Sequence, residues 1–377
     1  MRVLSPTPNS QLPASILVRG VNWLGDAVMT TPALMRLRER FPDARIVILT
    51  PEKLAELWRN HPAVNEIISI APGEGLFSVS RKLRSGKFDL ALVFPNSPRS
   101  AMEPWLARIP QRIGYSRPWR NFFLTKTVAA RAEYFPMRKL SEEAIRLLIE
   151  NSRANTKFNP PPKAHHIFEY LHLAGALGAN PEPLPPRLFV EEKEIRDAAI
   201  RFNLNSENRP IFALNPGAEY GPAKRWPAEK FIAVAKEIQR QTNCAWILLG
   251  GKNDLPIANQ IESGLQNSKF KIQNCCGKTS LRELMALLKC CRALLTNDTG
   301  PMHVAAALET PVVALFGSTS PELTGPGLPG DSRNQWLKSD APCSPCFLRE
   351  CPIDFRCMTE IPVERVVNAV LKTARTN

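Results

Sequence analysis

The sequence predicts an α/β protein built from two doubly wound, Rossmann-like domains. Short apolar runs alternate with helix-like stretches along most of the chain, and this alternation starts again after Pro181. Apolar strands that alternate with helices form parallel sheets covered on both faces. A chain of 377 residues, 44% of them hydrophobic and 22% charged, is long enough for two domains that each bury a core.

The first series of elements occupies the N-terminal half. Strands are expected at Ser15–Arg19 (SILVR), Arg45–Thr50 (RIVILT) and Asp89–Phe94 (DLALVF), because each is a short apolar run. A helix is expected over Thr31–Arg40, where Pro32 suits the first helical turn.

The second series repeats this pattern in the C-terminal half, and a last helix is expected over Pro362–Thr376. The other expected strands are Pro210–Leu214, Ala245–Gly250, Ala293–Thr296 and Pro311–Phe316. The helices expected between them are Ala228–Thr242, Ser280–Cys290 and Met302–Leu308. Ligand sites in such sheets lie at the carboxyl ends of the strands, so the loops that follow the strands are the places to look for chemistry.

A proline-rich segment separates the two series. Asn180–Arg187 (NPEPLPPR) has four prolines in eight residues and can continue neither a helix nor a central strand. We therefore expect an N-terminal domain over residues 1–180, a hinge over 181–187 and a C-terminal domain over 188–360. The polar stretch Asn151–His166 is expected to be a loop.

The formal net charge of +14 favours an anionic partner, which could be nucleic acid, anionic lipid or a phosphorylated substrate. Arg108–Lys139 contains eight basic residues and a single acid, Glu133, so it carries about half of this excess. Aromatic residues interleave with these cations, at Tyr115, Trp119, Phe122, Phe123, Tyr134 and Phe135. A solvated basic face would explain the charges but not the aromatic neighbours.

Several protein classes are disfavoured. No apolar run reaches the ~18 residues of a membrane-spanning helix, and the N-terminus lacks the apolar core of a secretory signal. All nine cysteines lie from Cys244 onward, an odd number that argues against a secreted disulfide scaffold. We therefore expect a cytoplasmic protein. No G-x-G-x-x-G follows a strand, which disfavours a nicotinamide-dependent oxidoreductase, and no base-reading motif is present.

The loop after the first strand, Gly20–Ala27 (GVNWLGDA), has the glycines of a tight turn. Its spacing resembles that of a phosphate-binding loop, but Asp26 stands where such a loop needs a lysine and would repel a phosphate. Asp26 could instead act as a general base at the mouth of a cleft. It could also simply cap the helix that follows.

Two loops of the second series suit an anionic ligand. In Asn215–Pro227 (NPGAEYGPAKRWP), Lys224 and Arg225 could hold a diphosphate, or the loop could be a solvated surface. Asn297–His303 (NDTGPMH) precedes an alanine-rich helix whose free N-terminal amides attract anions. In the second loop, Asp298 or Thr299 could merely cap the helix, and His303 could be structural instead of binding a phosphate or sugar oxygen.

Two further segments carry weaker signals. Gly250–Asp254 (GGKND) follows a strand and could contact a ribose or base, while Asn274–Ser280 (NCCGKTS) precedes a helix. Near the C-terminus, Cys343, Cys346, Cys351 and Cys357 are spaced C-x2-C-x4-C-x5-C. These four thiols could form a structural metal site, a labile disulfide or a reduced cluster.

Three long motifs, in this order, resemble the ADP-heptose:lipopolysaccharide heptosyltransferases of glycosyltransferase family 9. They are RGVNWLGDAVMTTPAL, NPGAEYGPAKRWPAEKF and TNDTGPMHVAAALETPVVALFGSTSPELTGP. The resemblance runs from about Ile16 to the C-terminus. The cysteine-rich segment CSPCFLRECPIDFRC is most similar to the heptosyltransferase II branch, which adds the second heptose of the inner core.

The resemblance implies a GT-B fold, with two Rossmann-like domains facing a central cleft. The C-terminal domain would bind ADP-heptose and the N-terminal domain the acceptor, while the helix in residues 361–377 would pack back on the N-terminal domain. Asp26 falls on the catalytic aspartate of the family. The implied donor-binding residues are Asn215, Gly217, Lys224, Arg225, Asp298, Thr299, Gly300, Pro301, Met302 and His303. The implied nucleoside contacts are Gly250, Gly251, Asp254 and Gly277, and the implied acceptor contacts are Asn22, Trp23, Arg112, Arg117 and Arg120.

The implied reaction is an inverting transfer of L-glycero-D-manno-heptose from ADP-heptose, without a cofactor or catalytic metal. The acceptor would be the first heptose on Kdo-lipid A, met at the anionic surface of the inner membrane, and no nucleic acid would be involved. Heptosyltransferase I or III, another family 9 transferase and a GT-B sugar-nucleotide epimerase remain alternatives. A nucleic-acid-binding protein is a more distant one.

Overall fold

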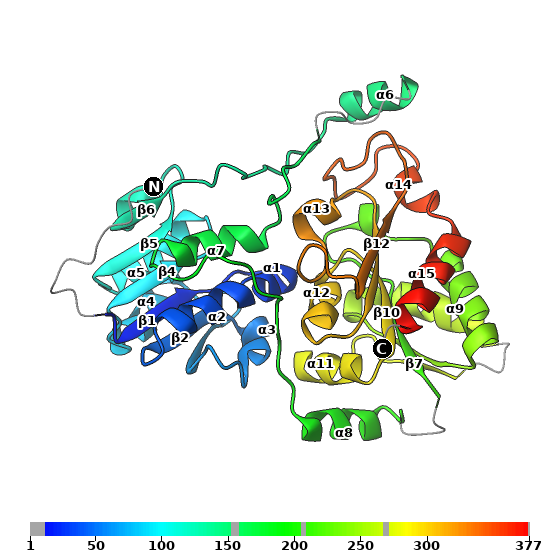
Figure 1. The fold of residues 1–377 in the computed structure, drawn as a ribbon, viewed down its shortest axis with the longest axis horizontal. Helices are drawn as coiled ribbons and strands as arrows, with labels where there is room; N and C mark the ends of the chain where they lie inside the picture. The colour runs from blue at the N-terminus through cyan, green and yellow to red at the C-terminus, as the bar shows by residue number, and fades with distance from the viewer. Residues whose placement is uncertain (1–11, 152–157, 205–208, 267–270, 376–377) are drawn as a thin grey trace. The chain divides into compact units, whose positions relative to one another are not determined.

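The chain divides into two compact units, and the computed structural model describes residues 12–151, 158–204, 209–266 and 271–375 (Figure 1). Unit 1 holds the chain up to Asn22 together with Pro32–Arg131 and Glu169–Glu182. Unit 2 holds Trp23–Thr31, Ala132–Phe168 and the chain from Pro183 onward. Residues 1–11, used for the expectation about a secretory signal, lie outside the described residues, as do 152–157 of the expected polar loop.

Unit 1 contains a six-stranded, fully parallel sheet with the strand order β3-β2-β1-β4-β5-β6. Its strands are β1 (Ser15–Arg19), β2 (Arg45–Pro51), β3 (Glu66–Ile70), β4 (Leu90–Val93), β5 (Gln111–Tyr115) and β6 (Lys126–Val128). The chain builds outward from β1 on one side and then returns to start the other side at β4. This is the strand order of a Rossmann fold, and it places a topological switch point between β1 and β4.

Unit 2 repeats the same topology with the order β12-β11-β10-β7-β8-β9, again fully parallel. Its strands are β7 (Ile211–Asn215), β8 (Ala245–Leu248), β9 (Ile272–Asn274), β10 (Ala293–Asn297), β11 (Val312–Phe316) and β12 (Asn334–Lys338). The switch point therefore lies between β7 and β10. The prediction of two Rossmann-like domains of the GT-B class is confirmed.

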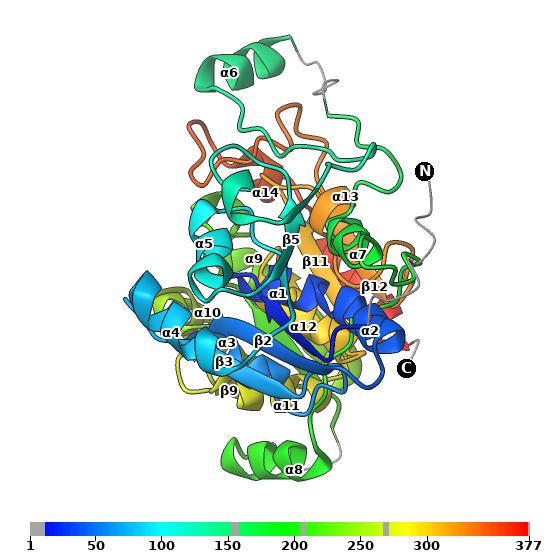
Figure 2. The same cartoon turned by 90° about the vertical axis from the view of Figure 1, so that its left-hand side faces the viewer.

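Helices cover the sheet of unit 1, and Figure 2 shows α3 and α4 on the side of β2 and β3. The helical segments of this unit are α2 (Thr31–Arg40), α3 (Glu52–Ala55), η1 (Glu56–Trp58), α4 (Leu76–Ser85), α5 (Pro98–Leu106), η2 (Asn121–Phe123) and α7 (Ile167–Gly175). The start of α5 follows from its sequence, because the Ser97 hydroxyl accepts a hydrogen bond from Ser100 N and Pro98 takes the first helical position.

Unit 2 has more helices, several of them short. Its helical segments are α1 (Leu24–Met29), α6 (Glu142–Glu150), α8 (Glu192–Arg201), η3 (Pro222–Lys224), α9 (Ala228–Thr242), η4 (Lys252–Asp254), α10 (Leu255–Leu265), α11 (Leu281–Lys289), α12 (Gly300–Ala307), α13 (Pro321–Thr324), α14 (Arg356–Thr359) and α15 (Val363–Arg375). A capping box of Ser280 and Glu283 begins α11, and Asn243 ends α9 in the left-handed conformation. No helix in the described ranges is long and apolar enough to cross a membrane.

The C-terminal helix α15 packs in the core of unit 2, and the expectation that it packs back on the N-terminal domain stays a prediction. Its buried face, which includes Val366 and Val370, shares one hydrophobic cluster with Phe231 of α9 and Leu315 of β11. Burial of this apolar stripe against α9 and the β10–β12 side of the sheet fixes its place.

The two compact units are not continuous in sequence, because Trp23–Thr31 and Ala132–Phe168 group with unit 2, and the expected domain bounds stay a prediction. Helix α1 lies against α12 through two glycines. A Cβ added to Gly300 would come within 2.9 Å of Leu24, and one added to Gly25 would come within 2.6 Å of His303. Towards the C-terminus, the chain passes from unit 1 to unit 2 between Glu182 and Pro183, inside the proline-rich segment. That this segment acts as a hinge stays a prediction.

Candidate functional site

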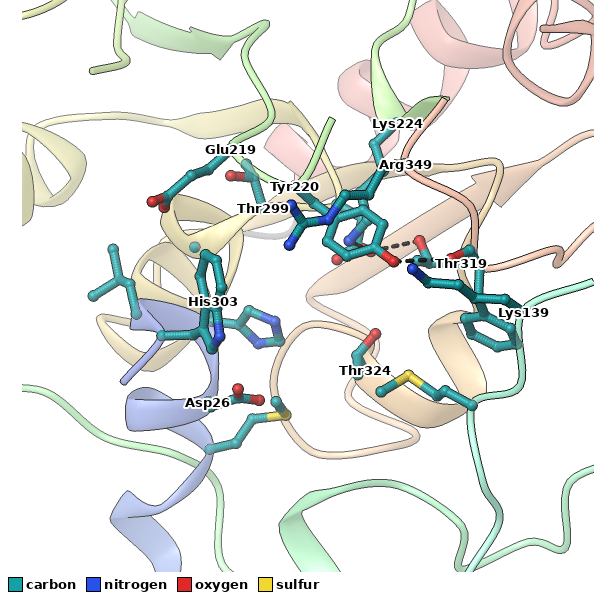
Figure 3. A pocket seen from close by; sticks show the side chains of 18 residues that line it. Asp26, Lys139, Glu219, Tyr220, Lys224, Thr299, His303, Thr319, Thr324 and Arg349 are labelled. Carbon is teal, nitrogen blue, oxygen red and sulfur yellow. Dashed lines mark hydrogen bonds and ion pairs between the residues drawn. The ribbon is translucent and has the colours of Figure 1, made fainter. Parts of the chain in front are cut away.

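A cavity of about 400 Å³ lies within unit 2, at the carboxyl ends of the strands that flank the switch point (Figure 3). Its walls come from α1, from the loop after β7, from the β10–α12 connection, from the segment after β11 and from the cysteine-rich segment. The residues that line it are Trp23, Leu24, Gly25, Asp26, Met29, Met137, Lys139, Glu219, Tyr220, Lys224, Asp298, Thr299, Gly300, His303, Thr319, Thr324, Phe347 and Arg349.

An ion pair between Lys224 and Asp298 connects the two loops at the switch point. The Lys224 Nζ lies 2.6 Å from Asp298 Oδ2, and the Thr319 hydroxyl donates to the same oxygen at 2.5 Å. Beneath this pair, Asn297 Nδ2 donates to Pro216 O at 2.7 Å. These contacts hold the loops after β7 and β10 in a fixed relation, so Asp298 positions the lysine instead of merely capping α12.

Asp26 lies in the first turn of α1 and faces the cavity (Figure 3). Its surroundings remove water from the carboxylate and thereby raise its pKa from 3.8 to about 6, although Lys224 opposes the shift and Asp298 adds to it. Trp23, and not Asp26, occupies the N-cap position, so the capping interpretation does not apply. Asp26 is therefore a carboxylate placed at a cavity, ionised above a pH of about 6.

His303 lies in the first turns of α12 and is 5% exposed. Burial lowers its pKa from 6.5 to about 4, so the imidazole is neutral at physiological pH. A neutral imidazole can either donate or accept a hydrogen bond to a sugar or phosphate oxygen. Its ring packs against Gly25, which places it beside Asp26 in the cavity wall.

The expected nucleoside-contacting residues cluster around the carboxylate of Asp254. Gly251 N donates to Asp254 Oδ2 at 2.9 Å, and Gly277 N donates to Gly250 O at 2.9 Å. A Cβ on Gly217 would fall 2.2 Å from the Asp254 Cγ, so glycine is required there. The structure brings these glycines together in unit 2, but none of them lines the cavity.

Four other expected donor residues lie outside the cavity lining. Asn215 is 2% exposed, and its Nδ2 donates to Leu249 O at 2.8 Å, which ties neighbouring strands together. Met302 is fully buried and Pro301 belongs to the first turn of α12. Arg225 lies 3.9 Å from Asp254, beside the glycine cluster around that residue.

The expected acceptor residues differ in their surroundings. Trp23 lines the cavity and is 47% exposed. In unit 1, the Arg112 guanidinium donates to the carbonyl oxygens of Phe123 and Ile109, and Arg120 is fully buried with one donor on Asn96.

The structure thus gives Arg112 and Arg120 internal hydrogen-bonding roles. Of the other two acceptor candidates, Asn22 is exposed and accepts from Arg19, and Arg117 lies over the Tyr115 ring at 5.8 Å.

Several cavity residues were missed by the sequence analysis: Met137, Lys139, Glu219, Tyr220, Thr319, Thr324, Phe347 and Arg349. Glu219 and Tyr220 share the loop of Lys224, and Thr319 and Thr324 belong to the third motif, so the motifs contained a usable signal for these four. Lys139 ends the basic stretch Arg108–Lys139 and Arg349 lies in the cysteine-rich segment, but nothing local in either segment singles out these two side chains. Their place in the cavity depends on long-range packing.

The four clustered cysteines are free thiols, as are the other five. Burial raises the pKa of Cys343 to about 11 and that of Cys357 well above its usual range, so both stay protonated at neutral pH. Across the described ranges of the chain, no three histidine, cysteine or acidic side chains are grouped so as to hold a metal ion. The segment instead supplies Phe347 and Arg349 to the cavity.

Two Rossmann-like units, with a carboxylate and a lysine in a cavity at the second switch point, are the arrangement expected of a GT-B protein. Residues 76–355 match the model of glycosyltransferase family 9 (heptosyltransferase), and the chain therefore belongs to that family.

The chain is 34% identical to lipopolysaccharide heptosyltransferase 2 of Salmonella typhimurium over 82% of its own length and 85% of the relative. The enzyme of the same name from Escherichia coli K12 gives the same identity and coverage. The solved structure of E. coli ADP-heptose lps heptosyltransferase II matches with a TM-score of 0.75 and 30% identity, covering 96% of this chain and 99% of that one. An E. coli heptosyltransferase bound to ADP, at 16% identity and a TM-score of 0.68 over 95% of this chain and 99% of that one, shows the same fold.

Proposed function

We propose that this glycosyltransferase transfers L-glycero-D-manno-heptose from ADP-heptose to the first heptose of the lipopolysaccharide inner core, with inversion at the anomeric carbon. The observation that carries the proposal is the cavity that combines Asp26 with the Lys224–Asp298 pair. The likeness to enzymes named heptosyltransferase 2 supports the choice of donor and acceptor. Relatives named heptosyltransferase 1 and 3 are less similar, at 24% and 23% identity.

Asp26 is proposed as the general base. A hydroxyl oxygen of the acceptor attacks the anomeric carbon of the donor, its proton passes to the Asp26 carboxylate, and the bond from that carbon to the diphosphate oxygen breaks. A pKa of about 6 leaves Asp26 ionised at neutral pH and makes it a stronger base than an ordinary aspartate. The same negative charge would stabilise the oxocarbenium character of the transition state.

The leaving ADP gains negative charge as this bond breaks. We propose that Lys224 and the first amides of α12, over residues 299–302, stabilise that charge. Protein donors would thus do the work that a bound metal does in other transferases. The glycine cluster around Asp254 is proposed to accept the nucleoside, and in the structure these glycines pack closely against Asp254 and Lys252 of the same region.

Mass spectrometry of two defined acceptors tests the proposal. With ADP-heptose, the enzyme should add one heptose to Kdo-lipid A that already carries the first heptose, and none to Kdo-lipid A without it. Transfer to the acceptor without heptose would instead assign the first heptosyltransfer. Release of an altered free sugar without an acceptor would indicate an epimerase.

We also propose that unit 1 brings the enzyme to the anionic cytoplasmic face of the inner membrane, where this acceptor lies. Trp119 is 89% exposed and Phe122 78% exposed, and the Phe122 ring packs against Trp105 and Phe123. Exposed cations accompany these rings, for example at Arg108. Aromatic rings beside basic side chains suit the interface of an anionic bilayer.

A further inference from the structure

The positive charge of Lys224 is largely neutralised by its ion pair with Asp298. Lys224 is 2.6 Å from Asp298, and their side chains are only 13% and 5% exposed, so each largely neutralises the other. Asp26 and Glu219 add two more carboxylates to the same walls. A nucleoside diphosphate brings more than one negative charge into this space, and it therefore needs positive charge beyond that of Lys224.

Arg349 supplies such a charge. Its Cζ lies 5.0 Å from the centre of the Tyr220 ring, and Lys224 Nζ lies 4.9 Å from the same centre, so both cations stack on one aromatic ring (Figure 3). Within the described part of the chain, the Arg349 guanidinium forms no ion pair, and its side chain is exposed at the cavity. Five N–H donors held on an aromatic face are well suited to bind phosphate oxygens.

The backbone of this segment is locked to the loop that carries Lys224. Ala223 N donates to Arg349 O at 3.0 Å, and the Tyr220 hydroxyl donates to Phe347 O at 2.8 Å. A Cβ on Gly221, whose φ is +155°, would come within 2.4 Å of Arg349 O, so glycine permits this approach. These contacts fix where the arginine side chain begins.

The same segment is anchored on its other side. Phe347 N donates to Ser318 O at 2.6 Å, and the Ser344 hydroxyl donates to Gly317 O at 2.8 Å, which ties it to the end of β11. Cys343 and Cys346 are buried in one hydrophobic cluster with Ile145 of α6. The cysteine-rich segment, residues 343–357, is therefore a brace between two loops of the cavity.

We propose that Arg349 is a binding residue for the diphosphate of the sugar nucleotide, acting beside Lys224, and that the cysteine-rich segment serves as the scaffold that holds it. The identity of the ligand rests on the proposed function. Arg349 lies outside the three long motifs, and among the cations that line the cavity Lys224 is largely neutralised by Asp298, whereas Arg349 and Lys139 are exposed.

Calorimetry with ADP and the full-length protein tests this inference without acceptor or turnover. Arg349→Ala should weaken ADP binding roughly 10-fold or more, the usual worth of a charge-assisted hydrogen bond. Arg349→Lys should restore part of the loss, since it keeps the charge without the planar donors. Arg356→Ala is the matched control, because Arg356 lies in the same segment and pairs with Asp354 away from the cavity.

ADP affinity of Arg349→Ala within about two-fold of the unmodified protein would overturn the inference, as would an equal loss in Arg356→Ala, which would indicate disruption of the whole segment. Melting temperatures of the variants show whether the fold is intact. If the unmodified protein itself fails to bind ADP, the proposed function is wrong, whereas ADP binding that ignores Arg349 rejects this inference alone.

Discussion

Asp26 combines two properties that a catalytic base needs, since it faces a cavity and its carboxylate is poorly solvated. The cost of removing water from the ionised carboxylate outweighs the attraction of Lys224 at this site, and the pKa rises to about 6. His303 shows the same physics with the opposite sign, because burial disfavours its charged form and lowers its pKa to about 4. At neutral pH Asp26 is therefore ionised, as the proposed general base must be, and His303 is neutral.

The pH dependence of turnover should follow Asp26. Because the base must be ionised, kcat/KM should fall as the pH drops through about 6 and level off above it. Asp26→Asn should lower kcat by a factor on the order of 10²–10⁴, the usual contribution of a general base. Steady-state assays from pH 5 to 8.5 measure both effects, and near-normal turnover by Asp26→Asn would remove Asp26 from this role.

The thermal stability of Asp26→Asn shows whether this variant is correctly folded. The folded-state pKa of Asp26, about 6, lies above its ordinary value of 3.8, so the folded protein holds this proton more tightly and loses stability as the pH rises from about 4 to about 6. Asp26→Asn removes that penalty, which amounts to at most about 3 kcal/mol. At pH 8 the variant should unfold at an unchanged or higher temperature, and loss of activity with a lower melting temperature would point to misfolding.

At the scale of elements, the contact of α1 with α12 sets the geometry of the site. Helix α1 carries Asp26 and α12 carries His303, and Gly25 and Gly300 allow the two helices to approach closely. Connections between Lys224, Asp298 and Thr319 bind the loops after β7, β10 and β11 in the same way. The relative positions of the site side chains therefore depend on the packing between short helices and loops.

Gly25→Ala should separate the two helices. The added methyl group would lie 2.6 Å from the buried ring of His303, which must move. A shift of this kind is expected to lower kcat about 10-fold or more and to destabilise the fold by roughly 1–3 kcal/mol. Gly75→Ala is a matched control, because its methyl group meets nothing within 4 Å. Equal kinetics for both variants would contradict the importance of this contact.

At the scale of the whole molecule, the basic stretch Arg108–Lys139 carries much of the excess positive charge. Arg112 and Arg120 of this stretch are nevertheless poor candidates for a binding surface. The Arg112 guanidinium donates hydrogen bonds to backbone carbonyl oxygens, and burial lowers the pKa of Arg120 to about 10. Substitution of Arg112 and Arg120 by acidic residues would destabilise the packing of unit 1, so it could not report on binding alone. The exposed rings of Trp119 and Phe122 are better targets for testing the proposed membrane face.

Trp119→Asn combined with Phe122→Ser should weaken sedimentation with phosphatidylglycerol vesicles about 10-fold or more, because each ring buries a large apolar area when it enters a bilayer interface. ADP affinity should stay unchanged, since both residues belong to unit 1. Ile200→Ser provides the control, as Ile200 is 63% exposed on α8 of unit 2. Vesicle binding that is equal in all three proteins would reject this face as the membrane contact.

Local patterns were sufficient for most of the inner strands and for the loops of the site, but the inner strand β5 was missed. Strands such as β1 and β11 are continuous apolar runs because both faces are buried, and the helices α2 and α9 carry clear start signals. Edge strands were missed. β6 has three residues, none of them fully buried, so its apolar pattern is too weak to read from the sequence.

The three motifs thus identified the family, Asp26 and the Lys224–Asp298 neighbourhood, because those residues are neighbours of strand ends whose position in a Rossmann fold is known in advance. The place of α15, the assignment of α1 to unit 2 and the entry of Arg349 into the cavity followed from packing between segments far apart in the chain. No local pattern specifies such contacts. They depend on which apolar faces and glycine surfaces fit together once the sheets have formed.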